Sequence, residues 1–185
     1  MANNLSYDLT APGAKKAITL FFIRLALVFT LWHITYAFLL APQRIIDKPL
    51  NNILTVSVVS GINLISPTKP DITWLPYKNR NGSLLIKNNK AVFGIADNCN
   101  GLNLMFTYVT VIFLLPYPLK RKLIFSCAGL AIIVAANILR ILALYYIYVY
   151  HNAIFDFSHH YLFTILLDIL IFCGWLLFIQ KKKPA

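Results

Sequence analysis

Three kinds of side chain that can act together on a carbonyl group stand out in this sequence: a cysteine, an arginine and a pair of histidines. Cys99 follows the polar segment 42–98 and precedes a long apolar run, so we expect it at the start of a membrane helix. The amino-terminal end of a helix carries partial positive charge, which lowers the pKa of a thiol and favours the thiolate. Arg140 comes late in another apolar run, and His159 and His160 come just before the last one.

These residue types suit an acyl transfer that depends on cysteine. A thiolate attacks a carbonyl carbon, and a nearby imidazole activates the thiol and then protonates the leaving amine. A guanidinium offers positive charge and fixed hydrogen-bond donors to the oxyanion that develops during the attack. Cys99, Arg140 and one of the two histidines are therefore candidate catalytic residues.

The composition is that of a protein that crosses a membrane several times. Of the 185 residues, 59% are hydrophobic and only 12% are charged, and the mean hydropathy is +0.69. Several apolar runs reach the roughly 20 residues that are needed to cross a bilayer. All six acidic residues are aspartates, so a mechanism with a catalytic glutamate is excluded. The sequence predicts an all-α polytopic membrane protein with about four transmembrane helices, forming one domain over residues 1–185.

The net charge of +11 is arranged around the apolar runs and does not indicate a nucleic-acid partner. Short basic clusters at 15–16, 120–122 and 181–183 predict that both termini and one turn face the cytoplasm, by the positive-inside rule. The partner that this pattern indicates is the lipid bilayer. The predicted boundaries are a cytoplasmic tail at 1–16, spans at 17–41, 99–115, 123–149 and 161–179, an external segment at 42–98, and a second cytoplasmic tail at 180–185.

The external segment is predicted to hold a surface helix and a short β-hairpin. Apolar residues recur at helical spacing over 49–65, with Pro49 in the first turn. The stretch 67–77 carries three prolines and is expected to be irregular. Two β-type runs, 83–86 and 91–96, surround a polar turn and lead straight into Cys99.

Neither a metal site nor a cofactor is expected. The three cysteines lie far apart, so the sequence has no CxxC redox pair and no zinc-ligand spacing. Cys127 and Cys173 lie within apolar runs and are interpreted as packing residues.

The candidate catalytic residues are predicted at one depth in the membrane. Arg140 comes 17 residues after the start of its span, a rise of about 25 Å, and so lies just below the outer surface of a core about 30 Å thick. Cys99, His159 and His160 are expected at the outer ends of their own spans. Asn137 precedes the arginine by one turn and shares its face.

Asp168 lies about two turns into the last span, where an acidic side chain needs a partner. Arg140 or Asn137 is a plausible partner by depth. We expect Asp168 to orient the arginine and not to transfer protons.

Three sequence elements resemble the exosortase/archaeosortase family. They are Cys99-Asn100-Gly101-Leu102, the Asn-x-x-Arg element within 136–141, and a histidine, His160, before the last apolar run. The resemblance covers residues 97–178, and the hairpin before Cys99 is also similar. Thr164 stands where the family often has a small residue, and the adjacent His159 leaves the choice of histidine open.

The resemblance implies a membrane cysteine protease or transpeptidase with Cys99 as nucleophile, Arg140 as oxyanion stabiliser and His160 as acid and base. Its implied substrates are secreted proteins with a C-terminal sorting signal, which consists of a short motif, a transmembrane helix and a basic tail. Cleavage through a cysteine thioester would take place at the outer face of a bacterial cytoplasmic membrane.

Two other classes of protein fit the same sequence. A small membrane subunit without enzymatic activity would use the polar residues for helix packing. A small transporter would line a pathway with Arg140, Asp168 and His160. Transporters place polar groups near the midplane of the membrane, whereas these residues gather mostly at one face, which favours chemistry at the surface.

Overall fold

The computed structural model describes residues 12–66, 71–77 and 81–180. The two predicted cytoplasmic tails, including the basic cluster at 181–183, lie mostly outside these residues. In chain order, the elements are α1 (Pro12–Thr35), a π-helical turn (Tyr36–Leu40), α2 (Ala41–Gln43), α3 (Asp47–Ile65), β1 (Thr73–Pro76), β2 (Gly82–Lys87), β3 (Lys90–Ala96), a 3-10 turn (Asp97–Cys99), α4 (Leu102–Leu114), α5 (Leu119–Tyr150), a 3-10 turn (Asn152–Ile154), α6 (Phe155–Phe157), a second π-helical turn (Ser158–Leu162) and α7 (Phe163–Ile179).

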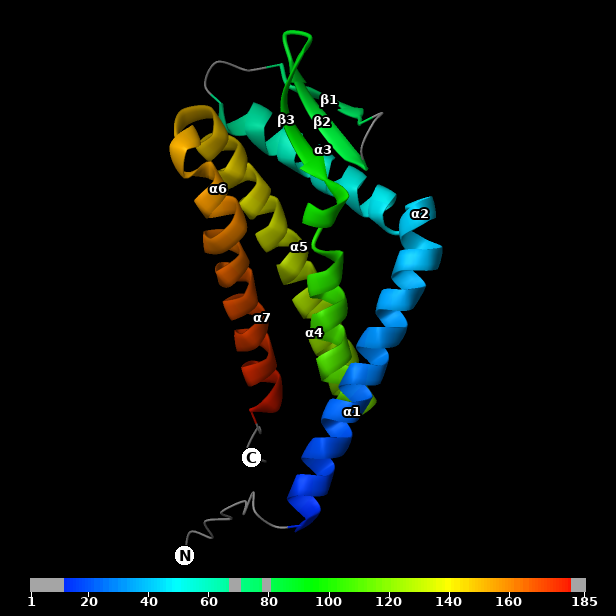
Figure 1. Cartoon of the computed structure of the whole chain (residues 1–185). Helices are drawn as coiled ribbons and strands as arrows, with labels where there is room; N and C mark the ends of the chain where they lie inside the picture. Colours follow the sequence, from blue (N-terminus) through cyan, green and yellow to red (C-terminus); the bar gives the residue numbers. More distant parts are fainter. Residues whose placement is uncertain (1–11, 67–70, 78–80, 181–185) are drawn as a thin grey trace, which may run out of the picture.

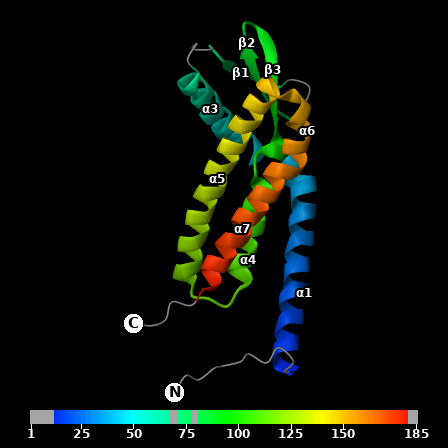
Figure 2. The ribbon, with the colours of Figure 1, turned by 90° about the vertical axis from the view of Figure 1, so that its left-hand side faces the viewer.

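The long helices run side by side below a small layer of α3 and the sheet (Figure 1). Three helical stretches, Lys15–Gln43, Leu119–Tyr150 and Asn152–Ile179, are long and apolar enough to cross a membrane. α4 is apolar but has only 13 residues, which rise about 20 Å. The start of α1 and the end of α7 lie at the end of the bundle opposite the sheet (Figures 1 and 2). The predicted fold class, a helical polytopic membrane protein with a small surface layer, is confirmed.

The helices α4, α5 and α7 pack around Tyr108. The ring of this buried tyrosine fills the space beside two glycines, Gly129 on α5 and Gly174 on α7, where a Cβ atom would meet the ring within 3 Å. At the end of the bundle opposite the sheet, Arg121 donates hydrogen bonds of 2.6 Å to the carbonyl of Phe178 and 2.8 Å to that of Gln180. The first turn of α5 therefore also caps the end of α7.

The surface layer has its own apolar core between α3 and the sheet. Leu54, Val58 and Ile62 repeat along the inward face of α3 and are completely buried. Leu85 and Ile95 meet them from β2 and β3. The strands pair antiparallel in the order β1-β2-β3. The predicted surface helix and hairpin are both present.

One region that was expected to be irregular is ordered. The strand β1 lies within 67–77, where prolines argued against a strand; Pro76 fits because β1 is at the edge of the sheet and needs no donor on its free side.

The connection between the last two predicted spans is mostly helical over 151–158 and continues into α7 through the π-helical turn Ser158–Leu162. This turn carries both candidate histidines.

Candidate functional site

Cys99 lies in a tight turn that joins β3 to α4. The 3-10 turn at 97–99 is followed by Gly101, whose φ of +81° is the left-handed conformation that glycine adopts without strain. A Cβ atom on Gly101 would also come within 3.3 Å of the amide nitrogen of Asn137. Glycine therefore provides both the bend and the close approach of α5 to the cysteine.

The turn is tied to α5 through Asn137. The fully buried amide of Asn137 donates a 2.8 Å hydrogen bond to the backbone carbonyl of Cys99. Because an asparagine inside a membrane helix needs a polar partner, this contact explains its position one turn before Arg140.

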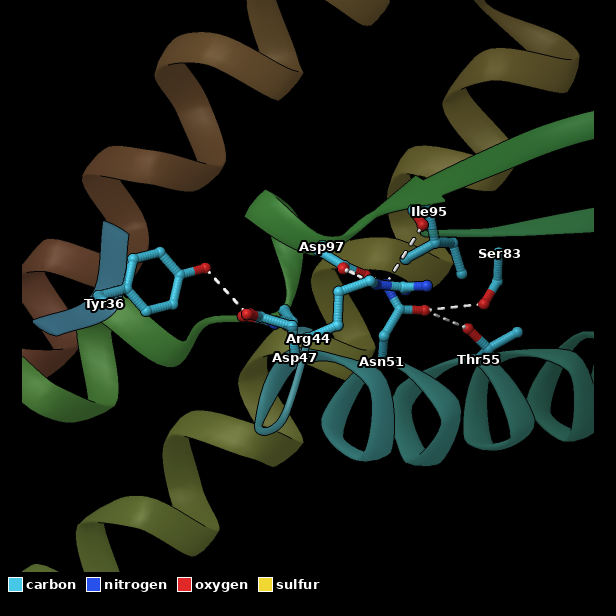
Figure 3. A network of polar contacts seen from close by, with 9 residues as sticks. Tyr36, Arg44, Asp47, Asn51, Thr55, Ser83, Ile95 and Asp97 are labelled. Carbon is cyan, nitrogen blue, oxygen red and sulfur yellow. Dashed lines mark hydrogen bonds and ion pairs between the residues drawn. The ribbon is translucent and has the colours of Figure 1, made fainter. Parts of the chain in front are cut away.

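A buried ion pair holds the same turn from the outer side (Figure 3). Arg44 donates from Nε and Nη2 to the two carboxylate oxygens of Asp97, at 2.6 and 2.8 Å. Asn51 on α3 adds a 3.0 Å hydrogen bond to Asp97, and its carbonyl oxygen accepts from Thr55 and Ser83. The bidentate contact with Asp97 raises the pKa of Arg44, so the pair is held in its charged form.

A second chain of contacts anchors the residue after the cysteine. The side chain of Asn100 donates a 2.7 Å hydrogen bond to Asp47 and accepts one of 2.8 Å from the backbone N–H of Leu102. Tyr36, in the π-helical turn after α1, donates to the other oxygen of Asp47 at 3.0 Å. Elements from four parts of the chain thus fix the backbone on both sides of Cys99.

His159 is the histidine that lies beside the cysteine. Its Nε2 atom lies 3.7 Å from Sγ of Cys99, and its ring stacks on Phe155 with a centroid distance of 5.8 Å. His160, the histidine indicated by the family resemblance, is exposed. The π-helical turn inserts one extra residue into the helical repeat, and such turns are frequent at functional sites. The geometry therefore favours His159 over His160 as the partner of Cys99.

Arg140 is half-buried, and its Nε atom is buried without a hydrogen-bond partner among the described residues. Its positive charge reaches both Cys99 and His159. Cys99 precedes α4 in a half-buried turn. The imidazole of His159 is the base within reach of its thiol proton.

The other predicted residues lie apart from this site. Asp168 is exposed on α7, and the described residues give it no hydrogen-bond partner, so its predicted role in orienting the arginine has no support from a contact. Cys127 and Cys173 are exposed on the helix surface.

Sequence reasoning missed Arg44, Asp47, Asn51 and Asp97. Their partners are far away in the sequence: Arg44 and Asp97 are 53 positions apart. The available signal was the presence of two aspartates near the ends of apolar elements in a chain with so few acids.

Among the described residues, no group of three or more histidine, cysteine or acidic side chains is placed to hold a metal ion. A family model described as transmembrane exosortase matches residues 5–182 of the chain. No curated protein and no solved structure matches it.

Proposed function

The chain belongs to the transmembrane exosortase family, and we propose that it cleaves the C-terminal sorting signal of secreted proteins through a thioester on Cys99. Membership of this family gives a membrane-embedded, transpeptidase-type role. The observation that supports the finer proposal is the 3.7 Å contact between Sγ of Cys99 and Nε2 of His159, next to the unpartnered Nε of Arg140.

The first half of the reaction forms the thioester. His159 Nε2 takes the thiol proton while the sulfur attacks the carbonyl carbon of the scissile peptide bond. The guanidinium of Arg140 donates to the resulting oxyanion. When the carbon–nitrogen bond breaks, His159 returns the proton to the leaving amine, which is the new amino terminus of the substrate's membrane helix.

The second half releases the product. An amine or a water molecule attacks the thioester carbonyl, His159 removes its proton, and the carbon–sulfur bond breaks. The proton then returns to the sulfur, so Cys99 is again a thiol. Transpeptidation and hydrolysis differ only in this acceptor.

The short α4 supports a site in the outer part of the membrane. If the inner ends of α4 and α5 lie at the cytoplasmic boundary, as the basic turn between them indicates, the 13 residues of α4 place Cys99 about 20 Å above that boundary. A peptide bond just outside a substrate's membrane helix starts about 30 Å above the same boundary, so it must move inward by about 10 Å to reach the sulfur. The active site thus faces the exterior, or the periplasm in a bacterium with two membranes.

The test is coexpression with a tagged reporter that carries a C-terminal signal of motif, membrane helix and basic tail from the host's own secreted proteins. We expect the tag to shift in mobility with the wild-type chain and not with Cys99→Ala. Cys127→Ala, a change at an exposed cysteine, is the matched control and should process normally. Cys99→Ser should give little cleaved reporter, because no base strong enough to deprotonate the serine hydroxyl is available.

If the reporter is still cleaved in cells that express Cys99→Ala, the cysteine mechanism is wrong. The reading of the chain as a non-enzymatic subunit or a small transporter would then take its place. Isolation of a reporter–Cys99 adduct that hydroxylamine releases would support the thioester directly.

A further inference from the structure

The strand β3, which leads into Cys99, has an unpaired edge. It is the last strand in the order β1-β2-β3. The backbone N–H of Asp97 bonds to Asn81 on the β2 side, and backbone groups of alternate residues point to opposite sides of a strand. The N–H and C=O groups of Gly94 and Ala96 therefore point away from β2. Both residues are exposed. The carbonyl of Ala96 accepts within the 3-10 turn Asp97–Cys99, whereas the outward N–H and C=O groups of Gly94 and the N–H of Ala96 have no backbone partner within 12–66, 71–77 or 81–180.

A cleft of 290 Å³ lies along this edge. It is lined by Leu84 and by residues 91–94 of the sheet, and by Tyr148 and Phe155 at the outer ends of the helices. Phe93 connects the two sides, with ring centroids 5.8 Å from Tyr148 and 6.3 Å from Phe155. The cleft thus has an aromatic lining on one side and free backbone groups on the other.

The cleft is continuous with the candidate active site at both walls. On the sheet side, β3 runs directly into the turn of Cys99 (Figure 1). On the helix side, Phe155 stacks on His159. A chain that lies in the cleft therefore leads to the sulfur and the imidazole together.

We propose that an extended segment of the substrate, immediately before its membrane helix, binds in this cleft as an added strand on the free edge of β3. This inference rests on the proposed function. Unpaired strand edges recognise extended polypeptides through the backbone, with side-chain pockets adding selectivity. Gly94 and Ala96 have the small side chains that permit close approach of another backbone.

The direction of the bound strand follows from the substrate. Its sorting signal runs from an external motif through a membrane helix to a cytoplasmic tail, so the chain passes from outside to inside. The strand β3 runs the same way, from the hairpin down to α4 (Figure 1). The added strand is therefore parallel to β3, with its last residues at Cys99.

Photocrosslinking tests the position and the direction of the strand. Benzoylphenylalanine is placed at Ala91 or at Ala96 in a Cys99→Ala chain, which leaves the tagged reporter uncleaved. Both should crosslink to the reporter, and Ala96 should reach residues closer to its membrane helix than Ala91 does. The matched control is Leu75, 58% exposed on the opposite edge of the sheet, which should not crosslink. Equal crosslinking from Leu75, the reverse order of contacts, or crosslinks to a second copy of the chain would overturn the proposal.

A substitution on the edge tests the backbone contact. Gly94→Pro removes the outward N–H without touching the bonds to β2, whereas Gly94→Ala keeps it; the new Cβ would lie 3.7 Å from Leu84. Processing by Gly94→Pro should fall about two- to tenfold below that by Gly94→Ala, the factor for one lost hydrogen bond. Alkylation of Cys99 should be equal in the two variants, which shows that the site is intact.

Failure of this inference is distinguishable from failure of the proposed function. If the wild-type chain processes the reporter while Gly94→Pro matches Gly94→Ala, the edge is not used. If the wild-type chain processes no reporter but the crosslinks form as described, the chain binds the signal without cleaving it. If Gly94→Pro does not insert into the membrane, the crosslinking experiment alone decides whether the edge of β3 binds the substrate.

Discussion

The ion pair between Arg44 and Asp97 should be needed both for stability and for the geometry at Cys99. The Asp97 side chain is 7% exposed and that of Arg44 is 22% exposed, so each change leaves a largely buried charge unpaired. Loss of one partner of a buried pair costs about 3–5 kcal/mol. We expect the loss for Asp97→Ala to lie near the lower limit, because the more exposed guanidinium of Arg44 can reach water. The loss for Arg44→Met should lie near the upper limit.

The double variant Arg44→Met/Asp97→Leu should lose much less free energy of unfolding than the two single changes lose together. The separate losses would add to about 8 kcal/mol. With both charges removed, no unpaired buried charge remains, and apolar replacements of such pairs are often neutral. One buried N–H of Asn51 loses its bond to Asp97, so the loss should be about 2 kcal/mol. Lys48→Met removes an exposed charge nearby and serves as the control, with an expected change of at most about 0.5 kcal/mol.

Equilibrium unfolding in detergent measures these free energies, and the alkylation rate of Cys99 reports on the turn. In Asp97→Ala the loosened turn exposes the thiol, so alkylation should become faster while reporter processing becomes slower. Additive losses in the double variant, or an Asp97→Ala protein as stable as the control, would refute the idea that this pair holds the turn.

Three further outcomes are expected. Arg140→Met removes a positive charge that favours the thiolate of Cys99, so the rise of alkylation with pH should shift to higher pH. Arg140→Lys should keep the alkylation profile but process the reporter about a hundredfold more slowly. His159→Ala should abolish processing of the reporter, and His160→Ala should reduce it only mildly. The reverse pattern in the same assay would assign the acid–base role to His160. A reporter fused after residue 183 should read as cytoplasmic, and an impermeant thiol reagent applied from outside should reach Cys99; an external reading of the fusion would invert the topology.

Hydropathy and short patterns predicted the parts of this fold that depend on local sequence. The spans around Arg140 and Asp168 follow from apolar length, and the hairpin before Cys99 follows from two β-type runs around a polar turn. The three-element pattern of cysteine, arginine and histidine also indicated the family. The spans and the hairpin depend on residues that are close together in the chain, and each of the three elements of the family pattern is itself a short local motif.

The rest depends on contacts that a single sequence does not display. Asp47 and Asn100 are 53 residues apart, and nothing local marks them as partners. The choice between His159 and His160 depends on a π-helical turn, which changes the facing of every later residue and has no reliable sequence signature. The half-buried turn that holds Cys99 before its helix likewise depends on distant contacts.

The short α4 makes the bilayer part of the proposed active site. If the inner end of α4 lies at the cytoplasmic boundary, as proposed above, its 13 residues leave Cys99 about 10 Å below the outer boundary of a hydrocarbon core about 30 Å thick. A substrate must therefore draw its peptide bond down to the sulfur, or the lipid must thin locally, and each ångström of mismatch costs a fraction of a kcal/mol. Lipids with shorter acyl chains lower that cost. The lipid composition of the membrane can thus set the rate of processing without any ligand, through its thickness alone.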